Sequence, residues 1–187
     1  MFKMISWTWI LAGVVLFWLI RAPGLSVHGQ QSVPQLPGAA GIVQTMGLMR
    51  ALVNQSIDHP IIRQHAARAT EHVARGNHKE MALAIGEWVR AHVRYFPDPL
   101  HKENLTSPGV MAAAVHAGKK VFGDCDDLSM YVAAMAKSAG MQPIFHGVGR
   151  GKQFHHIYTE VAGVPVDPTV ALGVQPFRAE RRISIKV

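Results

Sequence analysis

The chain has 187 residues, of which 49% are apolar and 17% charged, so it can bury a core and is neither disordered nor fibrous. Its formal net charge of +7 favours anionic partners, such as a membrane surface or an acidic envelope polymer. The lysines and arginines are scattered and are not interleaved with aromatic residues, which argues against specific nucleic-acid recognition. One cysteine is present, so no internal disulfide can form and one thiol is left for other chemistry.

Residues 1–24 are predicted to be a membrane anchor or a signal peptide. An apolar run from Met4 to Ile20 follows Lys3, contains three of the four tryptophans and ends before Arg21. The run is longer than the core of a signal peptide, about 7–15 residues, and shorter than a bilayer span of about 20. Tryptophans near both ends are typical of a membrane interface. We therefore expect an uncleaved anchor and a domain that is membrane-anchored or secreted, outside the cytoplasm.

The rest of the chain is predicted to form a flexible linker at 25–40 and one domain at 41–187. The linker is rich in Gln, Pro, Gly and Ser, a composition typical of flexible segments. In the domain, apolar spacing, capping residues and prolines predict five helices. These are residues 41–54, a helix that Asp58 caps and Gly76 ends, one from His78 that ends before Pro97, one from Ser107-Pro108 to Gly118, and residues 124–139.

Strands are predicted near the end of the chain. The alternating segments are 143–149, 153–161, 164–166 and 183–187, whereas 96–106 is predicted to be a loop. A hairpin joins the second and third strands at Ala162-Gly163. Because helices come first and strands last, the order predicts an α+β fold with a small antiparallel sheet. The helix that carries the cysteine is expected to pack on this sheet through one apolar face.

The cysteine lies in the stretch Gly123-Asp124-Cys125-Asp126-Asp127. Asp124 is the expected N-cap of the helix, and Asp127 lies three residues later, as in a capping box. A helix N-terminus stabilises a thiolate, so the thiol pKa is expected to fall well below its usual value of about 8.5. Single cysteines are also often inert core residues, and neighbouring carboxylates raise a thiol pKa unless a cation offsets them.

A histidine segment and an aspartate downstream supply the partners that a nucleophilic cysteine needs. If Ala162-Gly163 is a two-residue turn, His156 and Asp167 lie on the same face of the hairpin as diagonal neighbours, within side-chain reach. The carboxylate can then orient the imidazole and stabilise its cationic form. A three-residue turn would shift the register and favour His155 instead.

A zinc site is the alternative for these side chains, with Cys125, His155, His156 and an aspartate as ligands. No paired C-x-x-C or H-x-x-x-H spacing supports it. We therefore expect neither a metal nor a cofactor.

Three motifs in this order resemble the transglutaminase-like superfamily, a branch of the papain-like cysteine enzymes. They are Gly123-Asp124-Cys125, His156-Ile157-Tyr158 and Asp167-Pro168-Thr169. The segment from Glu87 to Pro99 is similar to the helix and loop that precede the cysteine in such domains, so the likeness spans roughly 78–172. The Gly-Asp-Cys-Asp-Asp form is typical of bacterial and phage members.

The resemblance implies a papain-like core in which Cys125 is the nucleophile, His156 the general base and acid, and Asp167 the orienting carboxylate. The implied reaction is acyl transfer at an amide bond of a protein or peptide substrate, through a thioester. Water as acceptor makes a peptidase or amidase, and an amine makes a cross-linking enzyme. The competing hypothesis is a non-catalytic binding or structural module of a virion or envelope that retains the fold.

Overall fold

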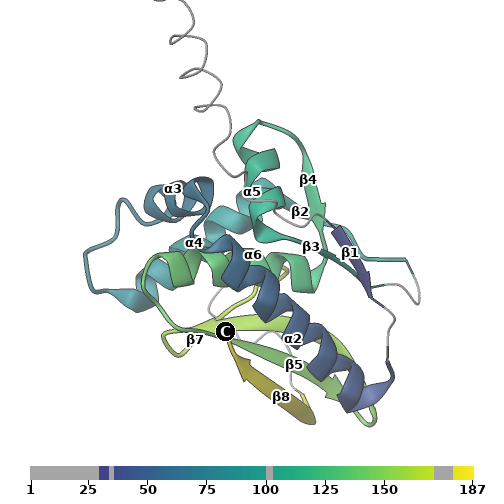
Figure 1. Cartoon of the computed structure of the whole chain (residues 1–187). Helices are drawn as coiled ribbons and strands as arrows, with labels where there is room; N and C mark the ends of the chain where they lie inside the picture. The colour runs from purple at the N-terminus through teal and green to yellow at the C-terminus, as the bar shows by residue number, and fades with distance from the viewer. Residues whose placement is uncertain (1–29, 34–35, 100–102, 171–178) are drawn as a thin grey trace, which may run out of the picture.

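The computed structural model describes residues 30–33, 36–99, 103–170 and 179–187. Within these ranges the chain is a mixed α+β structure of five helices and eight strands (Figure 1). The predicted anchor at 1–24 lies outside the described residues. In the part of the chain that is described, no helix is both long and apolar enough to cross a membrane.

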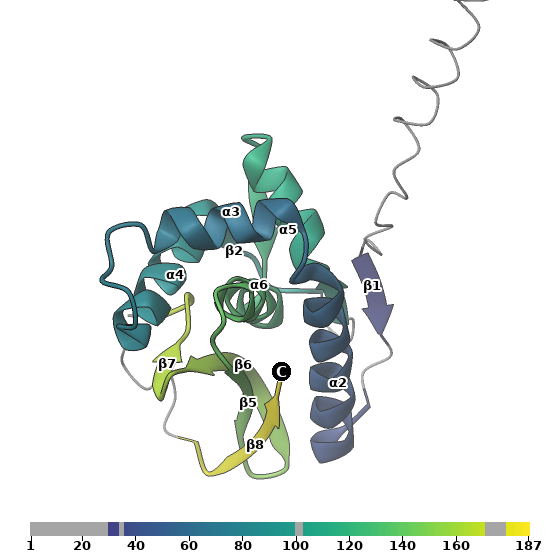
Figure 2. The ribbon, with the colours of Figure 1, turned by 60° about the vertical axis from the view of Figure 1, so that its left-hand side comes forward.

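The five predicted helices are all present, with small changes at their ends. They are α2 (Gly38–Ser56), α3 (Pro60–Ala69), α4 (His78–His92), α5 (Pro108–His116) and α6 (Cys125–Ser138). Figure 2 shows α6 at the centre, with the other helices around one side of it and strands β5, β6 and β8 on the other. The helix that carries the cysteine therefore packs between a layer of helices and a sheet.

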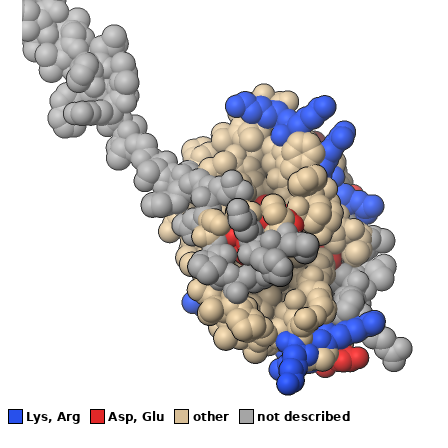
Figure 3. All heavy atoms as spheres, turned by 90° about the vertical axis from the view of Figure 1, so that its right-hand side faces the viewer, with Lys and Arg blue, Asp and Glu red and all other residues tan. Residues whose placement is uncertain are grey.

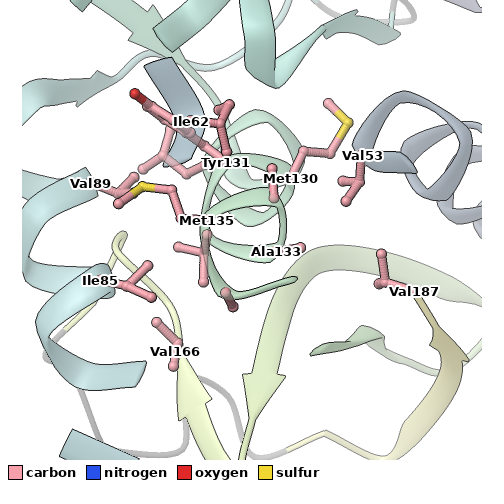
Figure 4. Close-up of a cluster of buried hydrophobic side chains, with 14 of the residues drawn as sticks. Val53, Ile62, Ile85, Val89, Met130, Tyr131, Ala133, Met135, Val166 and Val187 are labelled. Atoms are coloured by element: carbon pink, nitrogen blue, oxygen red, sulfur yellow. The ribbon is translucent and has the colours of Figure 1, made fainter. Parts of the chain in front are cut away.

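The burial of α6 differs from the prediction of a single apolar face. Every residue from 126 to 136 is buried, on all sides of the helix. Alanines at 133, 134 and 136 allow neighbouring elements to approach closely, while Tyr131 and Met135 fill the space between α6 and the other helices (Figure 4). A helix enclosed on all sides is held rigidly, which fixes the position of its first residue.

The main sheet has the strand order β7-β6-β5-β8, and every pair in it is antiparallel. Its strands are β5 (Pro143–Arg150), β6 (Gln153–Val161), β7 (Val164–Val166) and β8 (Arg181–Lys186). These strands and the antiparallel sheet confirm the predictions from alternating residues. The face of this sheet that carries Phe145 and Val161 contributes to the core beneath α6.

Two small strand pairs were not predicted. β2 (Val93–Tyr95) pairs in parallel with β4 (Val121–Gly123), and β1 (Gln30–Val33) pairs antiparallel with β3 (Glu103–Thr106). The predicted loop at 96–106 thus ends in a strand, and the predicted linker at 25–40 contains β1 and the first turn of α2. Those two predictions were wrong there because these strands have only three or four residues, too few for apolar alternation to identify them.

The start of α3 also corrects a prediction. Pro60 occupies the first helical turn, so the N-cap is His59 rather than Asp58, and the His59 side chain accepts a hydrogen bond from the Ile61 N–H. Proline fixes the starting dihedral of a helix and is favoured at this position. The helix ends at Ala69, well before Gly76.

Candidate active site

Cys125 is the first residue of α6, directly after β4 and the N-cap Asp124. This confirms the predicted position of the cysteine. Gly123, the last residue of β4, has no room for a side chain, because an added Cβ would lie 2.7 Å from the Cβ of Asp127. The glycine in the Gly-x-Cys motif is therefore required by the close approach of β4 to the first turn of α6.

The predicted capping box forms only in part. The Asp124 side chain makes no capping hydrogen bond, which corrects the prediction for that residue. The Asp127 carboxylate accepts from the Thr106 N–H at 2.7 Å and so ties the end of β3 to α6. Burial raises the pKa of Asp127 to about 8, while hydrogen bonds from the backbone N–H groups of Thr106 and Asp124 lower it.

His156 and Asp167 form a direct hydrogen bond, with 2.5 Å between Nε2 and Oδ2. His156 lies on β6 and Asp167 directly follows β7. The His156 side chain is 19% exposed and that of Asp167 2%. A buried carboxylate at this distance fixes the ring orientation and the tautomer of the imidazole.

The hairpin turn selects His156 over His155. Val161 pairs with Val164, so the turn has two residues, and both Ala162 (φ 54°) and Gly163 (φ 75°) have positive φ. Positive φ at both central positions is typical of a type I′ turn. This confirms the predicted two-residue register and excludes the three-residue alternative.

Thr169 holds Asp167 in place. Its backbone N–H and its hydroxyl both donate to Asp167 Oδ1, at 2.9 and 2.7 Å. Each oxygen of the Asp167 carboxylate therefore has a partner, with Oδ2 directed to His156. Reasoning from the sequence gave Thr169 no role, although the Asp-Pro-Thr motif contained the signal.

Cys125 and His156 line the same cavity, whose volume is about 720 Å³. Tyr95 also lines it, and so do three acidic residues, Asp98, Glu103 and Asp124. Figure 3 shows one face of the molecule, on which Lys and Arg lie toward the periphery and Asp and Glu appear near the middle. The cavity that contains the thiol therefore carries negative charge in an otherwise basic protein.

The environment of Cys125 raises the pKa of its thiol, contrary to the prediction. Burial is the largest cause, and the carboxylates of Asp124 and Glu103 add to it. A hydrogen bond from the Ile157 N–H acts in the opposite direction. The sequence indicates a helix N-terminus, which lowers a thiol pKa, and flanking carboxylates, which raise it. In the fold, burial and these carboxylates dominate.

Glu103, Asp124 and Asp126 bring their carboxylates together beside the cysteine, with one oxygen from each within 4.8 Å of the others. Asp126 is 1% exposed, and burial and the two neighbouring carboxyl groups raise its pKa well above the usual value. Within the described ranges, Cys125, His155 and His156 are not brought together as metal ligands. Sequence reasoning missed Glu103, because it lies 21 positions before Asp124.

Comparisons with known proteins add little to this geometry. No family model matches the sequence. No curated protein matches it. Among solved structures, the chain is similar to a "putative protease" from Parabacteroides distasonis, with 12% identity and a TM-score of 0.44. The similarity covers 66% of this chain and 25% of that protein, so this chain spans about a quarter of its length. A likeness this weak carries no argument.

Proposed function

We propose that this protein is a transglutaminase-like cysteine enzyme that performs acyl transfer at amide bonds. The observation that carries the proposal is the 2.5 Å hydrogen bond between His156 and Asp167 at the cavity that also contains Cys125. A thiol, an imidazole and an orienting carboxylate are the groups that nucleophilic catalysis by cysteine requires. The motifs that carry these residues occur in the order found in transglutaminase-like enzymes.

The hydrogen bond to Asp167 defines the role of each nitrogen of His156. Nε2–H donates to the carboxylate, so Nδ1 is the nitrogen that exchanges a proton with Cys125. Because the surroundings raise the pKa of the Cys125 thiol, a base has to take its proton before the sulfur can attack. Nδ1 takes the thiol proton as the Sγ–carbon bond forms, and Asp167 stabilises the resulting imidazolium.

The thioester forms in two steps. Attack of sulfur on the amide carbonyl moves the π electrons onto oxygen. The N–H of Cys125, which lies in the first turn of α6 and so has no acceptor within the helix, is the proposed main-chain donor to this anion. Collapse of this intermediate breaks the carbon–nitrogen bond, and the His156 imidazolium gives its proton to the departing amine. Tyr95 lines the same cavity, so its hydroxyl is the proposed side-chain donor to the oxyanion.

Water or an amine then attacks the thioester, with His156 as the general base. Hydrolysis is the preferred outcome because water needs no second binding groove. The substrate is a protein or a peptide. We further propose that residues 1–24 tether the domain to a membrane, outside the cytoplasm, where the net charge of +7 favours an acidic envelope polymer as a neighbour.

A non-catalytic binding or structural module is the second candidate function. The raised pKa of Cys125 is the observation that favours it, because a thiol that stays protonated is a poor nucleophile unless a base takes its proton. The two candidates therefore differ in whether His156 activates Cys125.

Acylation by p-nitrophenyl acetate tests the proposal in the full-length chain, because this ester acylates a thiol nucleophile without specific substrate recognition. We expect a burst of nitrophenol that matches the enzyme concentration, with the acyl group on Cys125 by peptide mass spectrometry. Cys125→Ala removes the burst and His156→Ala slows it by about 100-fold. An equal acylation rate in the His156 variant would contradict the proposal.

The same acyl-enzyme separates hydrolysis from transfer. Adding a primary amine such as glycinamide at increasing concentration shows where the acyl group goes. A hydrolase releases acetate at a rate that the amine barely changes. A transferase forms acetylated amine at a rate that rises with amine concentration and then saturates.

A further inference from the structure

We propose that a second cavity, next to the one that contains Cys125, is a substrate subsite for an aromatic side chain of the peptide. This second cavity has a volume of about 310 Å³. Two exposed phenylalanine rings, those of Phe96 and Phe122, form part of its walls. The inference rests on the proposed function, and it adds the class of substrate that the enzyme takes.

The two cavities share a wall. Pro97, Asp98 and Pro99 line both the cavity that contains Cys125 and the second cavity. Phe122 precedes Cys125 by three positions, so their Cα atoms are at most about 11 Å apart. Successive residues of an extended peptide advance by about 3.3 Å. A peptide whose amide bond lies at Cys125 can therefore bring a long side chain to Phe122 from a position one or two residues away.

The rings of Phe96 and Phe122 are exposed although they are large and apolar. Phe96 is 63% exposed and Phe122 51%. The rings pack edge to face, with their centroids 6.2 Å apart. The Phe96 N–H donates to the Gly123 carbonyl at 2.9 Å, which ties the residue after β2 to β4. Aromatic surface that stays in solvent beside a cavity is typical of a binding site.

The carboxyl groups at the polar end of the second cavity already have partners. The Asp98 carboxylate accepts from the Asn104 N–H, and the Asp127 carboxylate accepts from the Thr106 N–H at 2.7 Å. Burial raises the pKa of Asp127 to about 8, so this group is largely protonated at neutral pH and adds little charge. The remaining charge of Asp98 excludes an acidic side chain from the cavity.

An aromatic side chain suits these walls better than an aliphatic or a basic one. Pro97 and Pro99 add apolar surface to the two phenylalanine rings. A further ring can pack edge to face against Phe96 and Phe122, an arrangement that stabilises aromatic pairs beyond the burial of their area. A lysine side chain would be attracted by Asp98, but its amine would lose hydration among apolar groups.

Alkylation of Cys125 by matched bromoacetyl amino-acid amides tests the subsite in the full-length chain. The reagents carry phenylalanine, alanine or lysine amide on the same reactive carbon, so their half-saturating concentrations compare the binding of the side chains. The phenylalanine reagent should half-saturate at a concentration at least about tenfold lower than the alanine reagent. Phe122→Ala, and separately Phe96→Ala, should reduce this preference to less than about threefold. Val43→Ser is the matched control, because Val43 is 46% exposed and lines neither cavity.

The same reagents separate this inference from the proposed acyl transfer. The nitrophenol burst reports on the activation of Cys125 by His156, whereas the ratio of two half-saturating concentrations does not depend on the reactivity of the thiol. A normal burst with equal values for the phenylalanine and alanine reagents would overturn the subsite alone. A lower value for the lysine reagent than for the phenylalanine reagent would also overturn it, as would an equal loss of preference in Val43→Ser. A missing burst with the preference intact would overturn the acyl transfer and leave an aromatic binding pocket.

Photochemical cross-linking locates the bound ring without any substitution in the protein. Bromoacetyl-p-benzoylphenylalanine amide is attached to Cys125 and irradiated, and peptide mass spectrometry then identifies the residue that captures the benzophenone. We expect capture within 96–99 or at Phe122. Capture within 153–155 or on α2, which contribute residues to the first cavity only, would overturn the proposal.

Discussion

His156 Nε2 lies 2.5 Å from Asp167 Oδ2, across a hairpin whose turn has only two residues. The pairing of β6 with β7 places the two side chains on one face, and the turn sets the register that makes them meet. The geometry of this pair therefore depends on a local hairpin rather than on distant packing. Thr169 completes it by holding the other oxygen of the carboxylate.

Thr169→Val tests whether that hydroxyl positions the carboxylate. The variant keeps the backbone N–H bond to Asp167 and loses the 2.7 Å hydroxyl bond, so acylation of Cys125 should slow by about tenfold. Asp167→Asn should cost more, about 100-fold or greater, because it removes the charge that stabilises the imidazolium. Stopped-flow measurement of nitrophenol release gives both rates. A Thr169→Val rate equal to that of the wild type would show that the backbone bond suffices.

The carboxylates that line the cavity should discriminate between charged and neutral thiol reagents. Asp98, Glu103 and Asp124 line the cavity, so they should repel the anion iodoacetate but not the neutral iodoacetamide. The quantity to measure, in EDTA at low salt, is the rate with iodoacetamide divided by the rate with iodoacetate. For Cys125 this ratio should be at least about fivefold larger than for a small free thiol. Raising the salt concentration should shrink the difference. A ratio that does not respond to salt would exclude an electrostatic cause.

The turn residue Ala162 is a site at which stability can be gained. Its φ of 54° is unfavourable for alanine, whereas asparagine tolerates this conformation and Asn-Gly is preferred in type I′ turns. Ala162→Asn should stabilise the fold by about 0.5–1 kcal/mol, measured by urea denaturation. Ala162→Val should destabilise it, since a β-branched residue is poorly tolerated there. Equal stability of the two variants would contradict the observed turn.

Acidification should destabilise the fold through the buried His65, which lies between α3 and α6. His65 is 2% exposed and bonded to the Tyr131 hydroxyl at 2.7 Å, and burial lowers its pKa to about 4. The unfolded chain, with an ordinary histidine pKa of 6.5, takes up a proton at a pH where the folded chain does not. This histidine therefore does not lower the free energy of unfolding above about pH 6.5. As the pH falls from there to about 4, the free energy of unfolding decreases, by about 3 kcal/mol in total.

The control for this effect is His65→Gln, which keeps a polar side chain and does not titrate. The free energy of unfolding of the wild type, measured between pH 7 and pH 4 (about one point per half unit), should fall more steeply than that of the variant. Asp127, whose pKa is about 8 in the fold, also makes the free energy of unfolding depend on pH in this range, and comparing the two proteins cancels that contribution. Parallel curves would show that His65 is protonated equally in both states.

Much of the fold could be predicted because its signals are local. Apolar spacing predicted α4 and α6, and strand alternation predicted β6 and β7. The same alternation, combined with a two-residue turn, is sufficient to place His156 and Asp167 on one face of the hairpin. These inferences succeeded because the two side chains belong to one hairpin, in which sequence distance determines spatial distance.

Features that depend on distant segments could not be predicted. Glu103 joins the two aspartates only through β3, a short strand without apolar alternation. The direction of the Cys125 pKa depends on the sum of burial and several charges. The sequence indicates the helix N-terminus and the adjacent Asp124, but it does not show the burial that is the largest cause of the shift.

The most direct test of the central claim is the rate at which iodoacetamide alkylates Cys125 in the full-length wild type and in His156→Ala, followed by intact-mass spectrometry. The chain has one cysteine, so a single mass shift reports on that thiol alone. If His156 takes its proton, the wild type should react about tenfold or more faster at pH 7, and the two rates should converge at high pH, where the thiol ionises without help. Equal rates at pH 7 would contradict an activated cysteine and favour a non-catalytic module.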